Sequence, residues 1–162
     1  MKLLTIIALG MLSLMAIANE YDADELPFVE IKEVADFESL SQEAKAKRKV
    51  IMLEMSATYC GYCRTLEEEI IKPMLRSGDY EDNVLIRKME IDSHAPIKGL
   101  KGDKTSPAQI ANRMDVFVTP TLIFLDSEGN EVSERILGVN SLDFYGAYVD
   151  SALEQGRRII QQ

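Results

Sequence analysis

The most constraining feature of this 162-residue chain is its only pair of cysteines, Cys60 and Cys63, which are separated by Gly61 and Tyr62. An even number of cysteines often indicates a disulfide that stabilises the fold. A disulfide that closes so short a loop removes little entropy from the unfolded chain, so it would stabilise the protein only weakly. The pair therefore favours redox chemistry over a structural role.

The N-terminus has the pattern of an export signal. Lys2 is followed by a nearly continuous apolar run that ends at Ala16-Ile17-Ala18, with small residues where signal peptidase needs them. The alternative, an N-terminal membrane anchor, is disfavoured because the run is shorter than the roughly 20 residues that span a bilayer. We expect a signal peptide over residues 1–18, a flexible lead-in over 19–27 and one domain over 28–162. The mature protein would be soluble in the periplasm.

Composition limits the classes of partner. The formal net charge is -9, which leaves no basic face for nucleic acid. The sequence contains no nucleotide or flavin motif, so we expect no bound cofactor and an external source of electrons. We also expect a monomer.

Hydrophobic patterning predicts the elements of the first half. Residues 35–49 are rich in Glu, Ala, Lys and Arg and predict an exposed helix. Residues 50–55 form the nearly continuous apolar run of a central strand that is covered on both faces. The next helix should begin at Cys60 and be kinked or ended by Pro73. Its predicted core-facing stripe consists of Cys63, Leu66, Ile70 and Met74.

The second half predicts a strand, a polar stretch, a short helix, a hairpin and a final helix. We expect the strand over 84–91, the polar stretch over 92–106 and the short helix over 107–113. The hairpin would pair 121–126 with 131–137 about a turn at 127–130, and the final helix would span 142–157 with Ser141 as N-cap. Strands alternate with helices and a hairpin follows, so the pattern predicts an α/β fold with one mixed sheet and helices on both faces.

Two motifs together resemble the thioredoxin superfamily. Cys60-Gly61-Tyr62-Cys63 follows a buried strand, and Val118-Thr119-Pro120-Thr121 opens a later one. The resemblance implies a thioredoxin fold, with the polar stretch as an insertion before the helix that precedes a cis-proline. A helix N-terminus favours a thiolate, which makes Cys60 the expected nucleophile. Cys63, one turn further on, would resolve the mixed disulfide.

The resemblance also assigns supporting residues. Glu54 stands where the superfamily's reductases have a buried acid, and burial would raise its pKa so that it could take the proton from Cys63. Lys88 aligns with a lysine that often pairs with this acid. The alternative is that both are ordinary solvated side chains.

A third group of residues is expected to bind substrate. Pro120 matches the family's cis-proline, whose preceding residue, here Thr119, pairs with an extended substrate segment; the alternative is a trans proline at an edge strand. Tyr59, Tyr62 and Gly138 match the rim of the substrate groove, although packing or turn formation would also account for them. His94, the only histidine, is expected to lie at the surface.

The remaining features divide between subgroups. Gly-Tyr between the cysteines and Thr before Pro120 resemble periplasmic disulfide isomerases, whereas Glu54 favours a reductase. The sequence also resembles small exported thioredoxin-like proteins that a membrane electron donor keeps reduced. We therefore predict reduction of disulfides in exported proteins, with isomerase or oxidase activity as the alternative. A third alternative, a site for a soft metal such as Cu(I), lacks a second cysteine pair or a histidine cluster, so we expect no metal.

Overall fold

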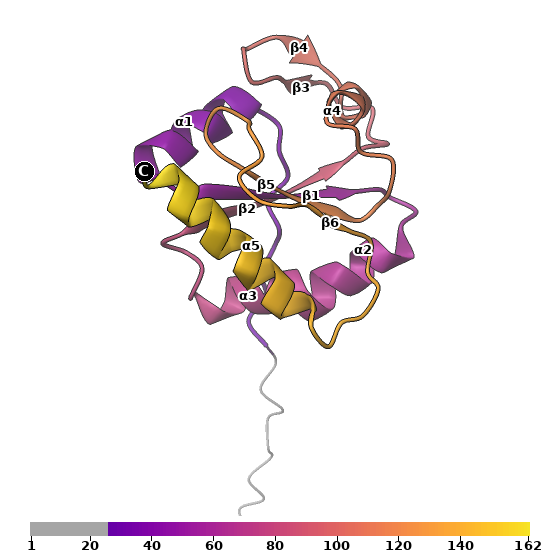
Figure 1. The fold of residues 1–162 in the computed structure, drawn as a ribbon. Helices are drawn as coiled ribbons and strands as arrows, with labels where there is room; N and C mark the ends of the chain where they lie inside the picture. Colours follow the sequence, from indigo (N-terminus) through magenta and orange to yellow (C-terminus); the bar gives the residue numbers. More distant parts are fainter. Residues whose placement is uncertain (1–25) are drawn as a thin grey trace, which may run out of the picture.

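A computed structural model describes residues 26–162; the predicted signal peptide and most of the lead-in lie outside the described residues. A four-stranded mixed sheet of order β2-β1-β5-β6 forms the centre, and helices cover both of its faces (Figure 1). The predicted α/β class with a mixed central sheet is confirmed. The elements are α1 (Phe37–Lys47), β1 (Val50–Ser56), α2 (Gly61–Leu66), a π-helical turn (Glu67–Ile71), α3 (Lys72–Ser77), β2 (Val84–Glu90), β3 (Ile97–Lys98), β4 (Lys104–Thr105), α4 (Pro107–Arg113), β5 (Thr121–Leu125), β6 (Ile136–Leu137) and α5 (Tyr145–Ile160).

β1 is the central strand that the apolar run predicts, and every residue in it is buried. It pairs in parallel with β2 and antiparallel with β5. Because side chains alternate along a strand, its two faces contribute to separate cores. Val50 and Met52 pack in the core that includes residues of α2, α3 and α5, whereas Ile51, Leu53 and Met55 pack in the core that includes residues of α1 and α4.

α1 is not exposed on all sides, and the prediction was wrong in this respect. Phe37, Leu40 and Ala44 are buried against the sheet, because their spacing of three and four residues places them on one helical face. The Asp36 side chain caps the N-terminus by accepting a hydrogen bond from the Ser39 N–H at 2.8 Å.

The helix after the cysteines differs from its prediction in one informative way. It continues past Pro73 to Ser77 through a π-helical turn, in which the Lys72 N–H donates to the carbonyl of Glu67. A π turn holds one extra residue, so it shifts the buried face by one position. As a result Ile71 is fully buried in place of the predicted Ile70, which is only partly buried.

The second half contains two further corrections. Only Ile136 and Leu137 of the predicted strand 131–137 pair with β5 as a strand, and Glu131 forms an isolated bridge to Leu125. α5 begins at Tyr145, and no side chain caps it, so Ser141 is not its N-cap. The polar stretch 92–106 folds into the small β3–β4 hairpin.

Among residues 26–162, no helix has both the length and the apolar character that a bilayer crossing requires.

Packing of α5 on the sheet predicts the effect of filling its buried glycine. A Cβ at Gly156 would lie 2.9 Å from Val132 Cγ2 and 3.1 Å from Val50 Cγ2. Valine side chains are stiff, so overpacking of about 1–3 kcal/mol should exceed the gain of up to about 1 kcal/mol in helix propensity. Gly156→Ala should therefore lower the free energy of unfolding in urea. Gly146→Ala, in the same helix with no atom within 4 Å of the added Cβ, should not.

Candidate active site

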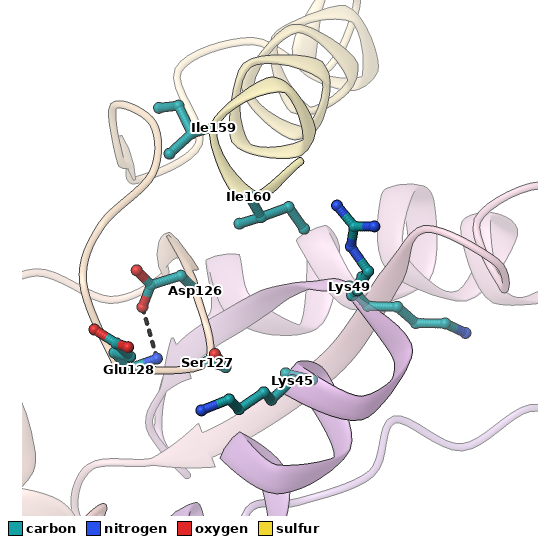
Figure 2. Close-up of a pocket in the computed structure, with 9 residues that line it drawn as sticks. Lys45, Lys49, Asp126, Ser127, Glu128, Ile159 and Ile160 are labelled. Atoms are coloured by element: carbon teal, nitrogen blue, oxygen red, sulfur yellow. Dashed lines mark hydrogen bonds between the residues drawn. The ribbon is translucent and has the colours of Figure 1, made fainter. Parts of the chain in front are cut away.

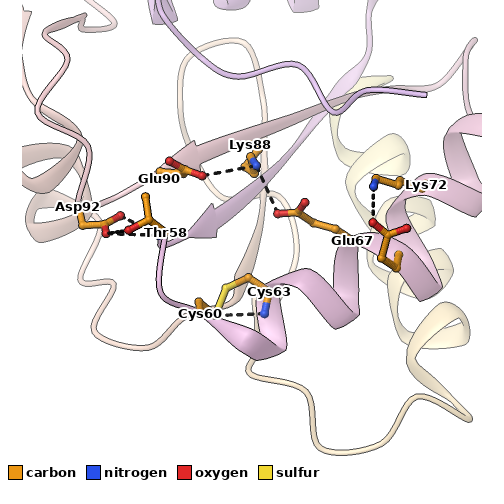
Figure 3. A network of polar contacts seen from close by, with 9 residues as sticks. Thr58, Cys60, Cys63, Glu67, Lys72, Lys88, Glu90 and Asp92 are labelled. Atoms are coloured by element: carbon orange, nitrogen blue, oxygen red, sulfur yellow. Dashed lines mark hydrogen bonds and ion pairs between the residues drawn. A yellow bond between two sulfur atoms is a disulfide. The ribbon is translucent and has the colours of Figure 1, made fainter. Parts of the chain in front are cut away.

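The two cysteines form a disulfide at the start of α2, shortly after the end of β1, and their Cα atoms lie 5.3 Å apart. Cys60 is the N-cap of α2, and its sulfur accepts a hydrogen bond from the Cys63 N–H at 3.1 Å (Figure 3). Cys60 is 7% exposed and Cys63 only 1%. Cys60 is therefore the sulfur nearer to solvent, in the order that attack by Cys60 and resolution by Cys63 would require.

Pro120 lies at the same end of the sheet. The Thr119–Pro120 peptide bond is cis, as the sequence predicts. Pro120 immediately precedes β5, and the first residue of β5, Thr121, pairs with Met55 near the end of β1. The Gly138 N–H, directly after β6, donates to the Pro120 carbonyl at 2.8 Å and so ties Pro120 to the edge of the sheet.

Glu54 is fully buried on the face of β1 that carries Val50 and Met52, between the sheet and the helices. Within the described part of the chain, neither of its carboxylate oxygens has a hydrogen-bond partner. Burial raises the pKa of Glu54 to about 8; the negative charges of Glu67 and Glu90 add to this shift, and the positive charge of Lys88 opposes it. A carboxyl with this pKa holds a proton at neutral pH and exchanges it readily with a thiol, whose usual pKa is about 8.5.

Lys88 stands directly opposite Glu54 in the parallel register of β1 and β2. Its ammonium forms ion pairs with Glu67 at 3.4 Å and with Glu90 at 3.6 Å (Figure 3). Burial alone would lower the pKa of Lys88, but these carboxylates outweigh burial and raise it. The structure thus brings Lys88 near Glu54 but directs its ion pairs to two other acids.

Glu67 was not identified from the sequence. It is the first residue of the π-helical turn, one turn beyond Cys63, and it faces Lys88. Its spacing of four residues from Cys63 is the signal that could have separated it from the neighbouring Glu68 and Glu69.

The aromatic residues beside the cysteines are exposed, as rim residues would be: Tyr59 is 76% exposed and Tyr62 is 68% exposed. Three more exposed apolar side chains at this end were missed: Phe117 and Val118 precede Thr119, and Leu137 in β6 pairs with Thr121. The positions of Phe117 and Val118 beside the Thr-Pro motif could have identified them, whereas Leu137 reaches this end only through its pairing with β5. His94 lies exposed in the loop after β2, as predicted.

A hollow between α1 and α5 lies at the other end of β1 (Figure 2). Lys45 and Lys49 line it together with Asp126 and Glu128, so charges of both signs are present. The length of β1 separates it from the cysteines.

Within residues 26–162, no group of three or more His, Cys, Asp or Glu side chains is arranged to hold a metal ion.

Comparison with known proteins decides the family. The chain matches the thioredoxin-like domain family over residues 37–152. It belongs to that family. Among solved structures, this thioredoxin-like chain resembles thioredoxin from Malassezia sympodialis, with a TM-score of 0.54 and 18% identity over 81% of this chain and 96% of that one. Fasciola hepatica thioredoxin has a TM-score of 0.51 and 17% identity, covering 78% and 99%. These likenesses support the thioredoxin fold.

Two curated relatives of this thioredoxin-like chain are thiol:disulfide interchange proteins DsbD. The protein from Yersinia enterocolitica is 25% identical over 125 residues, and the one from Ralstonia nicotianae is 23% identical over 132 residues. The alignments cover 76% and 82% of this chain but 20% of each relative, so the chain spans about a fifth of their length. Family and cysteine geometry together make the protein a thioredoxin-like thiol-disulfide oxidoreductase.

The buried carboxyl of Glu54 should make stability fall as pH rises. Its pKa is about 8 in the folded protein against an ordinary value of 4.5, so between these values the folded state binds more protons than the unfolded state. The free energy of unfolding should therefore lose about 3 kcal/mol between pH 4.5 and pH 7 through this group. Urea unfolding of Glu54→Gln should lack that loss, so the variant gains on the wild type as pH rises. Parallel pH profiles of the two proteins would contradict this.

Proposed function

We propose that this protein reduces disulfides in exported proteins through Cys60 and Cys63 and is itself re-reduced by a membrane-bound thiol-disulfide donor. The similarity to DsbD supports a relay of this kind, and the apolar N-terminal run supports export to the periplasm. The mature protein would work in solution between donor and client.

The balance of acidic and basic side chains around Lys88 supports action as a reductase. Lys88 supplies one ammonium and forms ion pairs with two carboxylates, Glu67 and Glu90, while Glu54, whose pKa is about 8, adds a further negative charge whenever it ionises. Strong oxidants in this family of reactions stabilise their reduced thiolate form. Here the excess of carboxyls disfavours a thiolate, so oxidation of the dithiol is favoured and the protein passes electrons on to a client.

Reduction of a client would proceed in two exchanges. The Cys60 thiolate attacks one sulfur of the client disulfide, forming a mixed disulfide and releasing the other client sulfur as a thiolate that takes up a proton. Cys63 then attacks the Cys60 sulfur, restores the intramolecular disulfide and releases the second client thiol. Glu54 in its ionised form accepts the proton that Cys63 loses.

Re-reduction would begin from the state that the structure describes. A donor thiolate attacks Cys60, the more exposed sulfur, and Cys63 leaves as a thiolate. Glu54, protonated at neutral pH because its pKa is about 8, supplies a proton to that leaving group. A second donor thiolate then attacks the donor sulfur of the mixed disulfide, which forms the donor disulfide and releases Cys60 as a thiolate, so that the protein is left in its dithiol form.

Client binding would use the loops at this end of the sheet. The backbone of Thr119 before cis-Pro120 would pair with an extended client segment, bordered by Gly138. The exposed rings of Tyr59 and Tyr62 would contact its apolar side chains.

The direction of electron flow is tested by the equilibrium redox potential in defined thiol-disulfide buffers. We expect a value close to thioredoxin's, about -270 mV, and a value between about -180 and -120 mV would instead indicate an isomerase or oxidase. Glu67→Gln should make the potential less negative, because it removes a carboxylate and frees Lys88 to stabilise a thiolate. Glu128→Gln, which removes a carboxylate at the far end of β1, is the matched control and should leave the potential unchanged.

The client class is tested by trapping. Cys63→Ala should accumulate mixed disulfides through Cys60, because nothing resolves them, whereas Cys60→Ala should trap none. The variants are expressed with the native N-terminus, and the trapped proteins are identified by mass spectrometry after separation under non-reducing conditions. Recovery of no exported protein, although Cys60 still reacts with small disulfides, would contradict the proposed role.

A further inference from the structure

The backbone that delivers Cys60 is a tight turn at the end of β1. The Cys60 N–H donates to the Ala57 carbonyl at 3.0 Å, which leaves Thr58 and Tyr59 exposed at the tip. On the other side, the Arg64 N–H donates to the Cys60 carbonyl at 3.4 Å as α2 begins. Cys60 therefore lies between α2, which its own hydrogen bonds hold in place, and an exposed turn. The position of that turn depends on contacts with another segment.

A second turn, at the end of β2, supplies that anchor. The Ser93 N–H donates to the Glu90 carbonyl at 3.0 Å, and this turn presents Asp92. One Asp92 oxygen accepts the Thr58 N–H at 3.1 Å, and the other accepts the Thr58 hydroxyl (Figure 3). The hydrogen bond from the Thr58 hydroxyl, and after it the one from the Thr58 N–H, lower the pKa of Asp92. The carboxylate is therefore ionised at neutral pH.

Two further contacts join the same turns. The Ile91 N–H donates to the Ser56 carbonyl at 2.9 Å, directly before the cysteine turn. The Ile91 side chain packs against a small cluster of Ala57, Cys60 and Cys63. The turn after β1 and the turn after β2 are therefore joined at the surface by Asp92 and in the interior by Ile91.

We propose that Asp92 is a positioning residue for Cys60, acting through Thr58. By fixing the turn, it holds the Cys60 sulfur within reach of Cys63 and so raises the effective concentration of one thiol at the other. The proposal rests on the proposed use of Cys60 and Cys63 as the working dithiol. Neither Thr58 nor Asp92 belongs to the motifs that the sequence singles out.

The consequence is a change in the disulfide equilibrium. Glutathione disulfide oxidises the reduced protein to its disulfide and yields two glutathione thiols, so two electrons and two protons pass from the protein to glutathione. A freer Cys60 closes the protein disulfide less readily, and the equilibrium moves toward the protein dithiol.

The test measures this equilibrium in glutathione buffers at pH 7 for the purified protein and four variants. Thr58→Val keeps every charge but loses the hydroxyl, and Asp92→Asn loses the ionised acceptor. Each should lower the equilibrium constant for oxidation by about threefold to tenfold, where tenfold corresponds to about 30 mV. Thr58→Ser, which keeps the hydroxyl, should retain the wild-type value. The double variant Thr58→Val/Asp92→Asn should be shifted no further than the larger single change.

A matched control separates positioning from stability. Asp36 accepts the Ser39 N–H at 2.8 Å and the Ser39 hydroxyl at 2.9 Å, the same chemistry at the start of α1. Asp36→Asn should lower the urea midpoint of unfolding and leave the glutathione equilibrium unchanged. An equal shift in Asp36→Asn, or an unshifted Thr58→Val, would overturn the proposal. A shift in Asp92→Asn alone would show that Asp92 acts through its charge, and would overturn it as well.

The positioning role of Asp92 and the proposed reductase function are tested by different measurements. The glutathione equilibrium needs no protein client, so it reports on Asp92 even if the protein reduces no protein disulfide. Reduction of insulin disulfides by the same preparations, followed by turbidity, reports on the reductase role independently.

Discussion

Burial of β1 on both faces is the constraint from which the rest of the site follows. The strand lies between β2 and β5, so its direction fixes where the chain emerges, and Cys60 follows directly from that end. The same burial makes the single acid within the strand, Glu54, costly to ionise, because water cannot solvate its charge. One strand thus leads to Cys60 and also carries a buried carboxyl that is protonated at neutral pH. The stability that ionisation of Glu54 removes at higher pH is a consequence of placing a titratable group where the fold requires an apolar one.

The environment of the dithiol is set by how a few charges are distributed. Lys88 is the register partner of Glu54, yet its ion pairs go to Glu67 and Glu90, so Glu54 keeps its raised pKa. Glu67, which forms an ion pair with Lys88, is also the first residue of the π turn that follows α2. That turn accommodates Pro73, which cannot donate a backbone hydrogen bond, and it moves Ile71 into the core. A packing adjustment around one proline and the electrostatics beneath the cysteines are therefore parts of one local structure.

Much of the fold was predictable because it depends on short-range pattern. The apolar run of β1, the turn after β5 and the helix bounded by Ser106 and Arg113 arise from local sequence, and each lies where it was expected. The misplaced features depend on contacts that the pattern does not contain. The spacing of Phe37, Leu40 and Ala44 is present in the sequence, but only the packing of α1 on the sheet decides that this face is buried, and the short β6 pairs with β5 through two residues. α5 begins at Tyr145, whose hydroxyl donates a hydrogen bond to the Gly138 carbonyl at 3.2 Å.

The sequence by itself determined the chemistry of this protein, because a two-residue spacing between cysteines at a helix N-terminus and a threonine-proline pair before a later strand are local features of the chain. It also placed an acid in a strand that has to be buried. Only the tertiary structure decided that Glu67 pairs with Lys88 and that Asp92 binds the cysteine turn through Thr58, since these residues come from segments that meet only when β1 and β2 pair. Such contacts depend on register and side-chain direction across the sheet, and neither is encoded in the spacing of residues along the chain.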